Sequence, residues 1–438
     1  MIEAGATAAA GIEAGSFPGG LTRRIIGNIT ALTAAQIFYR LVSLVLSIIL
    51  MRYLGVREQG VYGLVLNFTA IFGAFADLGI SNLVIRDMNQ DRFDPSRLIS
   101  TYLTLLVAAN VVLFAAAFAT AAALGYEKRV TAAIVLAAAG TVGQGVSSAF
   151  YAALVGRERM KRVALLEVAA TLVVAAGVTA VVLAGGGVVE LAGVSALAGF
   201  ARLVLFARPV LRLFPGIGLV PDLRRALSLL RRGVPFMLLV GSYALLTRVD
   251  VVLIEWLSDE FTLGIYTAAA RLTYPLTILS MMTATAVFPV LSRCMVDRSG
   301  AAFTLVRSTM LWLAAAGLAV AAPVALLAHE IIPLLAGSAY APAGNVLRIL
   351  IWYIPILYLY QVVGDMLVAA NRVWGVVAIT LVCLAVNFAL NTLLIPRYGA
   401  LGAAVTTIAC EALRCAGLLS YARFGLKFRL LREGTTPP

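Results

Sequence analysis

Long apolar runs dominate this sequence and decide what kind of fold it can adopt. A transmembrane helix needs about 20 consecutive, mostly apolar residues, and twelve runs of at least this length alternate with charged or glycine- and proline-rich breaks. The runs cover residues 25–51, 61–85, 98–124, 131–155, 162–184, 188–213, 233–257, 262–290, 303–328, 343–370, 373–395 and 399–422. The sequence therefore predicts an all-α integral membrane protein with about 12 transmembrane helices.

The composition excludes a water-soluble globular protein. Apolar side chains make up 62% of the 438 residues and charged side chains 13%, whereas soluble domains carry about 25% charged residues. The twelve runs leave room only for helix extensions and short connections. We therefore expect no large soluble domain on either side of the membrane.

Lysine and arginine are distributed unevenly over the connections between the runs. If the N-terminus is cytoplasmic, 22 of them fall on the inner side and five on the outer side. The outer five are Arg52, Arg57, Lys128, Arg129 and Arg397. Because basic residues resist translocation, this bias predicts that both termini are cytoplasmic. It also accounts for the net charge of +13, so no nucleic-acid partner is expected.

A short sequence echo indicates that one six-helix unit occurs twice. Leu54 and Gly60-Val61-Tyr62 are matched by Leu257 and Gly264-Ile265-Tyr266, 203 or 204 residues later. A parallel repeat of this kind predicts two six-helix lobes with a central cavity between them. The predicted parts are a disordered cytoplasmic tail (1–22), an N-lobe (23–214), an amphipathic cytoplasmic linker (215–232), a C-lobe (233–424) and a cytoplasmic tail (425–438).

The linker carries an apolar stripe between two arginine pairs. Leu223, Leu227 and Leu230 share one helical face. Such a helix can lie on the cytoplasmic surface and contact anionic lipid headgroups. The alternative is a simple topological anchor between the lobes.

The sequence lacks the residues that several kinds of enzymatic chemistry require. No lysine follows a glycine, so the GxxxxGK[ST] phosphate-binding loop is absent. His329 is the only histidine, which argues against a histidine metal cluster and a Ser-His relay. The four cysteines form no CxxC pair and are most simply packing residues. The sequence therefore argues against an enzyme and predicts no metal and no cofactor.

Three arginines within the predicted helices are candidate substrate-binding residues: Arg40, Arg202 and Arg248. A charged residue at mid-membrane costs about 2.5–3.5 kcal/mol on insertion scales, so it normally faces a partner or a wet cavity. The guanidinium group keeps its charge when desolvated and binds phosphate through two parallel hydrogen bonds. Several arginines in one cavity thus suit a phosphate head joined to a lipid tail. Hydrogen bonding between helices is the alternative role.

Acidic residues within the predicted helices provide candidates for ion coupling. Asp77, Asp250 and Asp365 are the candidate carriers of a coupling proton or cation. Glu411 and Arg414 lie three residues apart on one helix, and we expect them to neutralise one another as a structural pair.

Short motifs rich in glycine and in arginine, aspartate or tyrosine recur along almost the whole chain after the tail. They are Arg52-Tyr53-Leu54-Gly55, Gly60-Val61-Tyr62-Gly63, Asp77-Leu78-Gly79-Ile80, Gly156-Arg157-Glu158-Arg159-Met160, Gly233-Val234-Pro235, Arg248-Val249-Asp250, Gly264-Ile265-Tyr266, Ala270-Arg271-Leu272, Phe288-Pro289, Asn387, Asn391, Leu394-Ile395-Pro396, Tyr398-Gly399 and Gly402-Ala403-Ala404. With these motifs the sequence resembles the polysaccharide-repeat (oligosaccharide) flippases of the multidrug, oligosaccharidyl-lipid and polysaccharide exporter superfamily.

The resemblance implies a specific transport function in the cytoplasmic membrane. Such proteins turn a polyprenyl-diphosphate-linked oligosaccharide from the cytoplasmic to the outer leaflet by alternating access of two lobes. The implied partners are this lipid-linked substrate, membrane lipids, and the polysaccharide polymerase or glycosyltransferases of the same pathway. Arg40 falls where related lipid II flippases also carry a first-helix arginine, which implies a diphosphate contact.

Two other functions stay open at this point. A cation-coupled multidrug exporter of the same superfamily shares the twelve helices, although acidic residues are expected in its cavity. A membrane-embedded glycosyltransferase or polysaccharide polymerase is the alternative from the enzyme class, and a sizeable soluble loop with paired carboxylates is expected there.

Overall fold

The computed structural model describes residues 19–88, 94–219, 222–277, 279–280, 282–283, 287, 291 and 301–425. All regular secondary structure in these residues is helical. Ten of the described helical segments are long and apolar enough to cross a membrane. The predicted all-α membrane architecture is therefore confirmed.

The first group of helices forms the N-lobe. Its elements are α2 (Gly19–Gly73), α3 (Ser81–Asp87), α4 (Pro95–Ala123), α5 (Lys128–Gly156), α6 (Met160–Leu183) and α7 (Val188–Leu213). Small residues allow α5 and α7 to approach very closely. A β-carbon added to Gly143 would lie only 2.5 Å from the carbonyl carbon of Gly199. Close backbone approach at glycine is a common way to pack helices in a bilayer.

The first two predicted helices are both present, but the second ends earlier than expected. Residues 25–51 and 61–85 were expected to form separate helices, and α2 consists of two helices that meet at Gly55, whose backbone is not helical. The φ of 74° at Gly55 lies in a region that glycine adopts at little cost. α2 then ends at Gly73, and residues 74–80 form turns before α3. α2 also begins at Gly19, inside the predicted tail.

The second group of helices forms the C-lobe. Its elements are α8 (Leu223–Leu246), α9 (Val249–Leu257), α10 (Glu260–Thr273), η1 (Tyr274–Thr277), α12 (Ala301–Leu326), α13 (Ala328–Ala336), η2 (Ser338–Tyr340), α14 (Ala343–Leu350), α15 (Tyr353–Ala369), α16 (Val373–Tyr398) and α17 (Ala400–Gly425). Two predicted helices are each interrupted, one at residues 247–248 and the other at residues 351–352. Most of predicted helix 262–290 after Thr277 lies outside the described residues.

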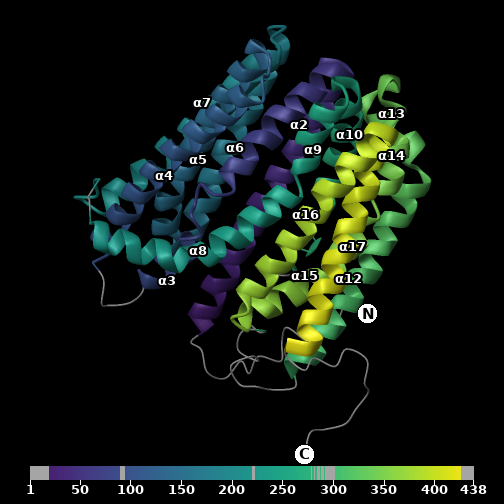
Figure 1. Ribbon diagram of the computed structural model, residues 1–438. Helices are drawn as coiled ribbons and strands as arrows, with labels where there is room; N and C mark the ends of the chain where they lie inside the picture. Colours follow the sequence, from purple (N-terminus) through teal and green to yellow (C-terminus); the bar gives the residue numbers. More distant parts are fainter. Residues whose placement is uncertain are drawn as a thin grey trace, which may run out of the picture.

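α8 links the lobes as one continuous helix. It contains most of the predicted linker and the start of the predicted seventh helix without a break at residue 232. Its first half packs on the N-lobe, where Arg232 forms a 2.9 Å ion pair with the buried Asp87. Its last turn packs on the C-lobe through Leu246. Figure 1 shows α8 crossing from the foot of the N-lobe helices to the C-lobe.

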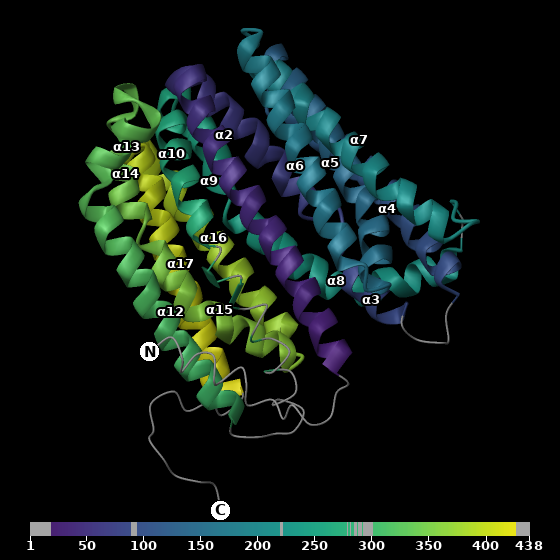
Figure 2. The ribbon, with the colours of Figure 1, turned by 180° about the vertical axis from the view of Figure 1, so that it is seen from behind.

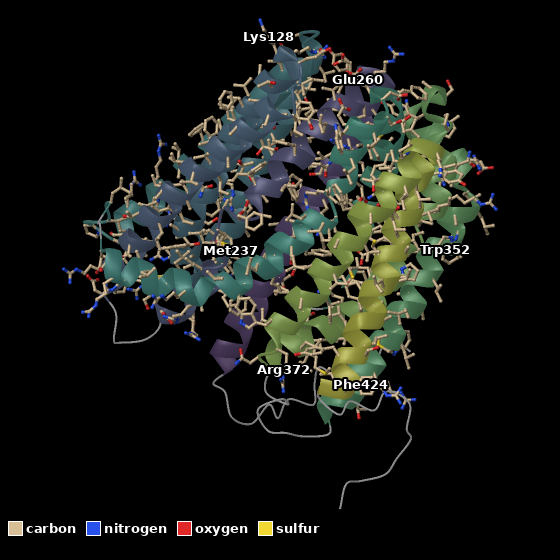
Figure 3. The ribbon with its side chains drawn as sticks, viewed as in Figure 1. Lys128, Met237, Glu260, Trp352, Arg372 and Phe424 are labelled. Atoms are coloured by element: carbon tan, nitrogen blue, oxygen red, sulfur yellow. The ribbon has the colours of Figure 1, made fainter. Side chains whose placement is uncertain are left out.

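The lobes meet closely at one end of the molecule. Figures 1 and 2 show α2 beside α10 at this end, whereas the first turns of α2 and the last turns of α17 lie at the opposite end. Arg52 donates hydrogen bonds to the carbonyl oxygens of Leu334 and Leu335, and Tyr340 donates one to Met51. Lys128 and Glu260 mark this end in Figure 3, and Arg372 and Phe424 mark the other.

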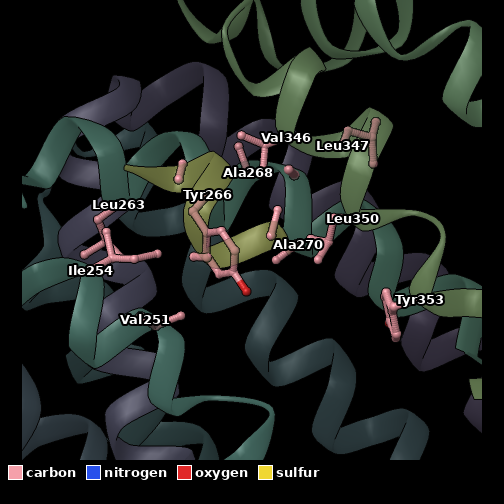
Figure 4. Close-up of a cluster of buried hydrophobic side chains, with 14 of the residues drawn as sticks. Val251, Ile254, Leu263, Tyr266, Ala268, Ala270, Val346, Leu347, Leu350 and Tyr353 are labelled. Carbon is pink, nitrogen blue, oxygen red and sulfur yellow. The ribbon is translucent and has the colours of Figure 1, made fainter. Parts of the chain in front are cut away.

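The C-lobe has a dense core behind the interface between the lobes. Figure 4 shows α9, α10 and α14 meeting around Tyr266, whose ring lies among aliphatic side chains such as Ile254 and Leu350. Both aliphatic residues are at most 2% exposed. In lipid this packing, rather than exclusion of water, holds helices together, so the core fixes the positions of α9 and α10 at the interface.

Candidate functional site

A cavity of about 500 Å³ lies between the two lobes. We call it the central cavity. Its walls come from α2 and α6 of the N-lobe and from α9, α10 and η1 of the C-lobe. The residues that line it include Arg40, Ser43, Ser47, Tyr62, Asn67, Val174, Arg248, Arg271 and Tyr274. A cavity shared by both lobes is the arrangement that the internal repeat predicts.

Arg40 reaches from the N-lobe across the central cavity to the C-lobe. Its Nη1 donates to the carbonyl oxygen of Tyr274 and to the hydroxyl of Thr277, both at 3.2 Å. The two acceptors lie on η1, where the chain leaves α10. Arg40 therefore lies where a ligand between the lobes would contact it. Both of these acceptors are neutral, so a charged acceptor such as phosphate can replace them.

Arg248 lines the same cavity from the break between α8 and α9. Its Nη1 donates to the hydroxyl of its neighbour Thr247 at 3.2 Å. It forms no ion pair with any residue that the structure describes. Two of the three predicted substrate-binding arginines, Arg40 and Arg248, thus line the same cavity.

Arg271 is a third arginine of the central cavity, and the sequence did not single it out. Its Nη1 donates to Ser47 at 3.3 Å, and its guanidinium lies 5.1 Å from the centre of the Tyr62 ring. It too lacks an ion-pair partner within the described part of the chain. The motif Ala270-Arg271-Leu272 was the available signal, but it does not tell which way the side chain points.

The central cavity is strongly cationic. Three arginines line it, and no aspartate or glutamate is present among its described lining residues. Guanidinium groups are weakly hydrated and offer planar forks of N–H donors, which match phosphate oxygens. This arrangement favours an anionic ligand with several oxygen acceptors.

Arg202 lies in a different place from the other two predicted arginines. It lines a pocket of about 340 Å³ inside the N-lobe, which we call the N-lobe pocket. There it forms an ion pair with Glu167, with 2.7 Å between Nη2 and Oε1. Tyr39 and Val174 line both this pocket and the central cavity, so the two adjoin.

Asp77 also lines the N-lobe pocket, at the turn that follows α2. Its carboxylate accepts hydrogen bonds from the hydroxyls of Ser81 and Tyr102. Asp365, the third predicted coupling residue, lies on α15 and does not line the central cavity or the N-lobe pocket. Its Oδ1 accepts from Gln361 at 3.4 Å, and its Oδ2 is buried with no hydrogen-bond donor among the described residues.

Asp250 is the most completely enclosed of the predicted acidic residues, with 1% of its surface exposed. Its oxygens accept hydrogen bonds from Asn391 at 2.7 Å, from Thr407 at 2.8 Å and from Tyr266 at 3.0 Å. Asn391 also donates to Asn387 at 2.9 Å, and the Oδ1 of Asn391 is itself buried without a donor within the described part of the chain. The i, i+4 spacing of the two asparagines was the sequence signal for this cluster.

Glu411 and Arg414, the predicted structural pair, are linked through Tyr360 rather than by a direct contact. No ion pair joins them; instead the hydroxyl of Tyr360 donates to Glu411 at 2.6 Å and accepts from Arg414 at 2.8 Å. The guanidinium of Arg414 lies between the rings of Tyr243 and Tyr360, at 4.3 and 4.8 Å. A tyrosine from another helix thus separates two charges whose spacing on α17 favoured contact.

Comparison with known proteins identifies the family. The profile of the family described as polysaccharide biosynthesis protein matches residues 25–295, which is more than half of the chain. The chain belongs to this family. A second profile, MatE, matches residues 235–393. The sequence matches no protein of the curated set.

Solved transporter structures share the fold of this family member. The lipid II flippase MurJ in an inward closed conformation gives a TM-score of 0.72 at 13% identity, covering 90% of this chain and 87% of that one. An inward-facing multidrug resistance MATE family transporter of the MOP superfamily gives a TM-score of 0.72 at 17% sequence identity. The match covers 89% of this chain and 94% of that one. An outward-facing structure of a multidrug resistance MATE family transporter gives a TM-score of 0.63 at 16% sequence identity. The match covers 91% of this chain and 95% of that one. MOP denotes the multidrug, oligosaccharidyl-lipid and polysaccharide exporter superfamily.

These similarities confirm several predictions made from the sequence. The chain is a multi-pass membrane protein of the polysaccharide biosynthesis family, and it has the two-lobed fold of solved MOP superfamily transporters. The solved structures that share its fold are described as a lipid II flippase and as multidrug transporters, not as glycosyltransferases or polymerases.

Proposed function

We propose that this protein flips a polyprenyl-diphosphate-linked oligosaccharide from the cytoplasmic to the outer leaflet for surface polysaccharide synthesis. One observation carries the proposal: Arg40, Arg248 and Arg271 line a single cavity between the lobes without an acidic residue among its described walls. A diphosphate presents several charged oxygens, and charge-assisted, forked contacts from arginine suit it.

Both lobes contribute to the diphosphate site in this proposal. Arg40 belongs to the N-lobe, whereas Arg248 and Arg271 belong to the C-lobe. The protein binds a ligand that contacts both lobes with a different affinity once the lobes have rotated apart. Only such a difference in affinity between two conformations can bias the equilibrium between them. Arg40 would exchange its bonds to Tyr274 and Thr277 for phosphate oxygens when the lipid binds.

We place both termini in the cytoplasm, following the distribution of basic residues. The end where Arg52 and Tyr340 join the lobes is then the outer end. The described conformation is thus closed to the outside. The higher TM-scores against the two inward structures than against the outward-facing one support this assignment.

The moving units in this proposal are the N-lobe, residues 23–214, and the C-lobe, residues 233–424. α8 spans the boundary between them and holds the N-lobe through Arg232 and Asp87. The arginine pairs of its first half would lie among anionic lipid headgroups at the cytoplasmic surface.

The glycosyltransferases of the pathway would act before the flipping step, and the polymerase would act after it. The distal parts of both predicted tails lie outside the described residues.

Asp250 is our main candidate for the coupling proton or cation, ahead of Asp77 and Asp365. A buried carboxylate without a cationic partner is costly, and no ion pair neutralises Asp250 among the described residues. The oxygens of Asn387, Asn391 and Thr407 around it are of the kind that hard cations prefer. Protonation would neutralise the same carboxylate.

Transport in proteoliposomes tests the function against the drug-exporter alternative. A fluorescent polyprenyl-diphosphate-linked oligosaccharide should become accessible to an impermeant reagent added outside, at a rate well above that of protein-free vesicles. A cationic dye such as ethidium should not be transported, since the central cavity is cationic. Transport of the dye without flipping of the lipid would reverse the assignment.

A further inference from the structure

The N-lobe pocket adjoins the proposed diphosphate site but differs from it in charge. Asp77, Glu167 and Arg202 line it, so its formal charge is −1, whereas three arginines line the central cavity. Arg202 uses both Nε and Nη2 on Glu167, at 3.4 and 2.7 Å. Its Nη1 donates to Ser147 and to the carbonyl oxygen of Gln144. Because these nitrogen atoms of the Arg202 guanidinium already donate hydrogen bonds within the protein, the group is poorly placed to bind phosphate.

The local packing explains why these polar groups share one space. Glu167 and Thr171 lie on one face of α6, and Gln144 and Ser148 on one face of α5, because each pair is spaced by four residues. The close approach of α5 and α7 at their glycines brings Arg202 to the same point. Three helices therefore present amide, hydroxyl, carboxylate and guanidinium groups to one pocket.

The pocket also has an aromatic residue at its junction with the central cavity. Tyr39 is 55% exposed and lines both spaces. Gln144 is exposed as well, with its side-chain amide offering both donors and an acceptor. A flat ring beside alternating donors and acceptors suits a sugar, which has an apolar C–H face and hydroxyls around its edge. An anionic sugar would meet Asp77 and Glu167 and be disfavoured.

We propose that the N-lobe pocket binds an uncharged sugar unit of the lipid-linked substrate while the arginines of the central cavity hold its diphosphate. This inference rests on the proposed function and names the class of sugar that the transporter accepts. The pocket volume of about 340 Å³ admits a small part of an oligosaccharide only. Selection therefore acts on the sugar nearest the diphosphate, because that unit lies nearest the junction at Tyr39.

Equilibrium binding to the purified full-length protein tests this inference with three probes. They are polyprenyl diphosphate with no sugar, the same lipid carrying a neutral disaccharide, and the same lipid carrying a disaccharide whose first unit is a uronic acid. We expect the neutral glycolipid to bind about tenfold more tightly than the uronic acid form. Equal binding of the two glycolipids, or tighter binding of the acidic one, would overturn the sugar assignment.

Two groups of variants separate the sugar pocket from the diphosphate site. Gln144→Ala and Ser148→Ala, which change residues of the N-lobe pocket only, should weaken binding of the neutral glycolipid by about three- to tenfold, the range of one or two lost contacts, and leave the sugar-free lipid unchanged. Arg248→Gln should weaken all three lipids alike. If the sugar-free lipid binds through Arg248 but the pocket variants change no preference, the sugar inference alone fails. If no diphosphate lipid binds, the proposed function fails with it.

Discussion

Gly60 of α2 packs directly against Gly264 of α10. A β-carbon on Gly60 would lie 2.8 Å from the backbone nitrogen of Gly264 and 2.4 Å from the carbonyl oxygen of Glu260. These are the glycines that the internal sequence echo pairs with each other. Equivalent points of the two halves thus touch, as expected where a pseudo-twofold axis along the membrane normal passes between the lobes.

The contact at Gly60 predicts a shift in the conformation of the transporter. Gly60→Ala should destabilise the described state by about 1–3 kcal/mol through overpacking, which is roughly a 5- to 150-fold change in population. Distances between spin labels at the other end of the lobes, where Arg372 lies, should shorten as the lobes close there. Gly193→Ala is the control, because nothing lies within 4 Å of its added carbon. Unchanged distances in Gly60→Ala would show that this contact does not stabilise the described conformation.

The membrane orientation can be checked with single cysteines. In a background without the four native cysteines, Glu158→Cys should be protected and Ser258→Cys labelled by an impermeant thiol reagent in intact cells. The reason is that residues 157–162 carry a dense basic cluster, which resists translocation. The opposite labelling pattern would overturn the assignment of the inner and outer ends.

The coupling role of Asp250 predicts a selective loss. Asp250→Asn should abolish the response of flipping to proton and sodium gradients, because the amide cannot release a proton and binds cations weakly. Asp77→Asn and Asp365→Asn are the comparisons in the same proteoliposomes. A full gradient response in Asp250→Asn, or gradient-independent flipping by the unmodified protein, would remove Asp250 from the mechanism.

The hydroxyl of Tyr360 should stabilise the C-lobe. Tyr360→Phe leaves Glu411 and Arg414 in place but removes the group that bonds to both, so buried charged atoms lose a partner. The expected loss of stability is about 1–3 kcal/mol, seen as a lower unfolding temperature in detergent. Tyr398→Phe serves as the control, because Tyr398 is 61% exposed. Equal stability of the two variants would contradict the bridging role.

Apolar run lengths predict the helices well but not their breaks. The runs mark where the chain can cross lipid, and ten of the described segments do qualify. The turns at residues 74–80 and the interruption before α9 occur within apolar sequence without a proline. The turns at 74–80 pack against α8 where Gly79 meets Gly233, a contact between residues far apart in the chain.

The candidate site could be predicted only as far as the internal repeat reaches. The repeat predicts a central cavity between the two halves, and Arg40 and Arg248, on the first predicted helix of each half, both line it. The rotation of a helix about its axis is hard to read when lipid-facing and buried faces are equally apolar. For this reason the sequence did not separate Arg202, which pairs with Glu167, from Arg271, which lines the cavity.

The rate of lipid flipping in arginine variants of the central cavity, measured in proteoliposomes at matched protein abundance, tests the diphosphate site most directly. Arg40→Gln and Arg248→Gln should abolish flipping, and Arg40→Lys and Arg248→Lys should retain part of it, because lysine keeps the charge but loses the two-point fork. Arg348→Gln is the matched control, since Arg348 does not line the cavity. Wild-type rates in both cavity Arg→Gln variants would contradict the proposal that these arginines bind the diphosphate.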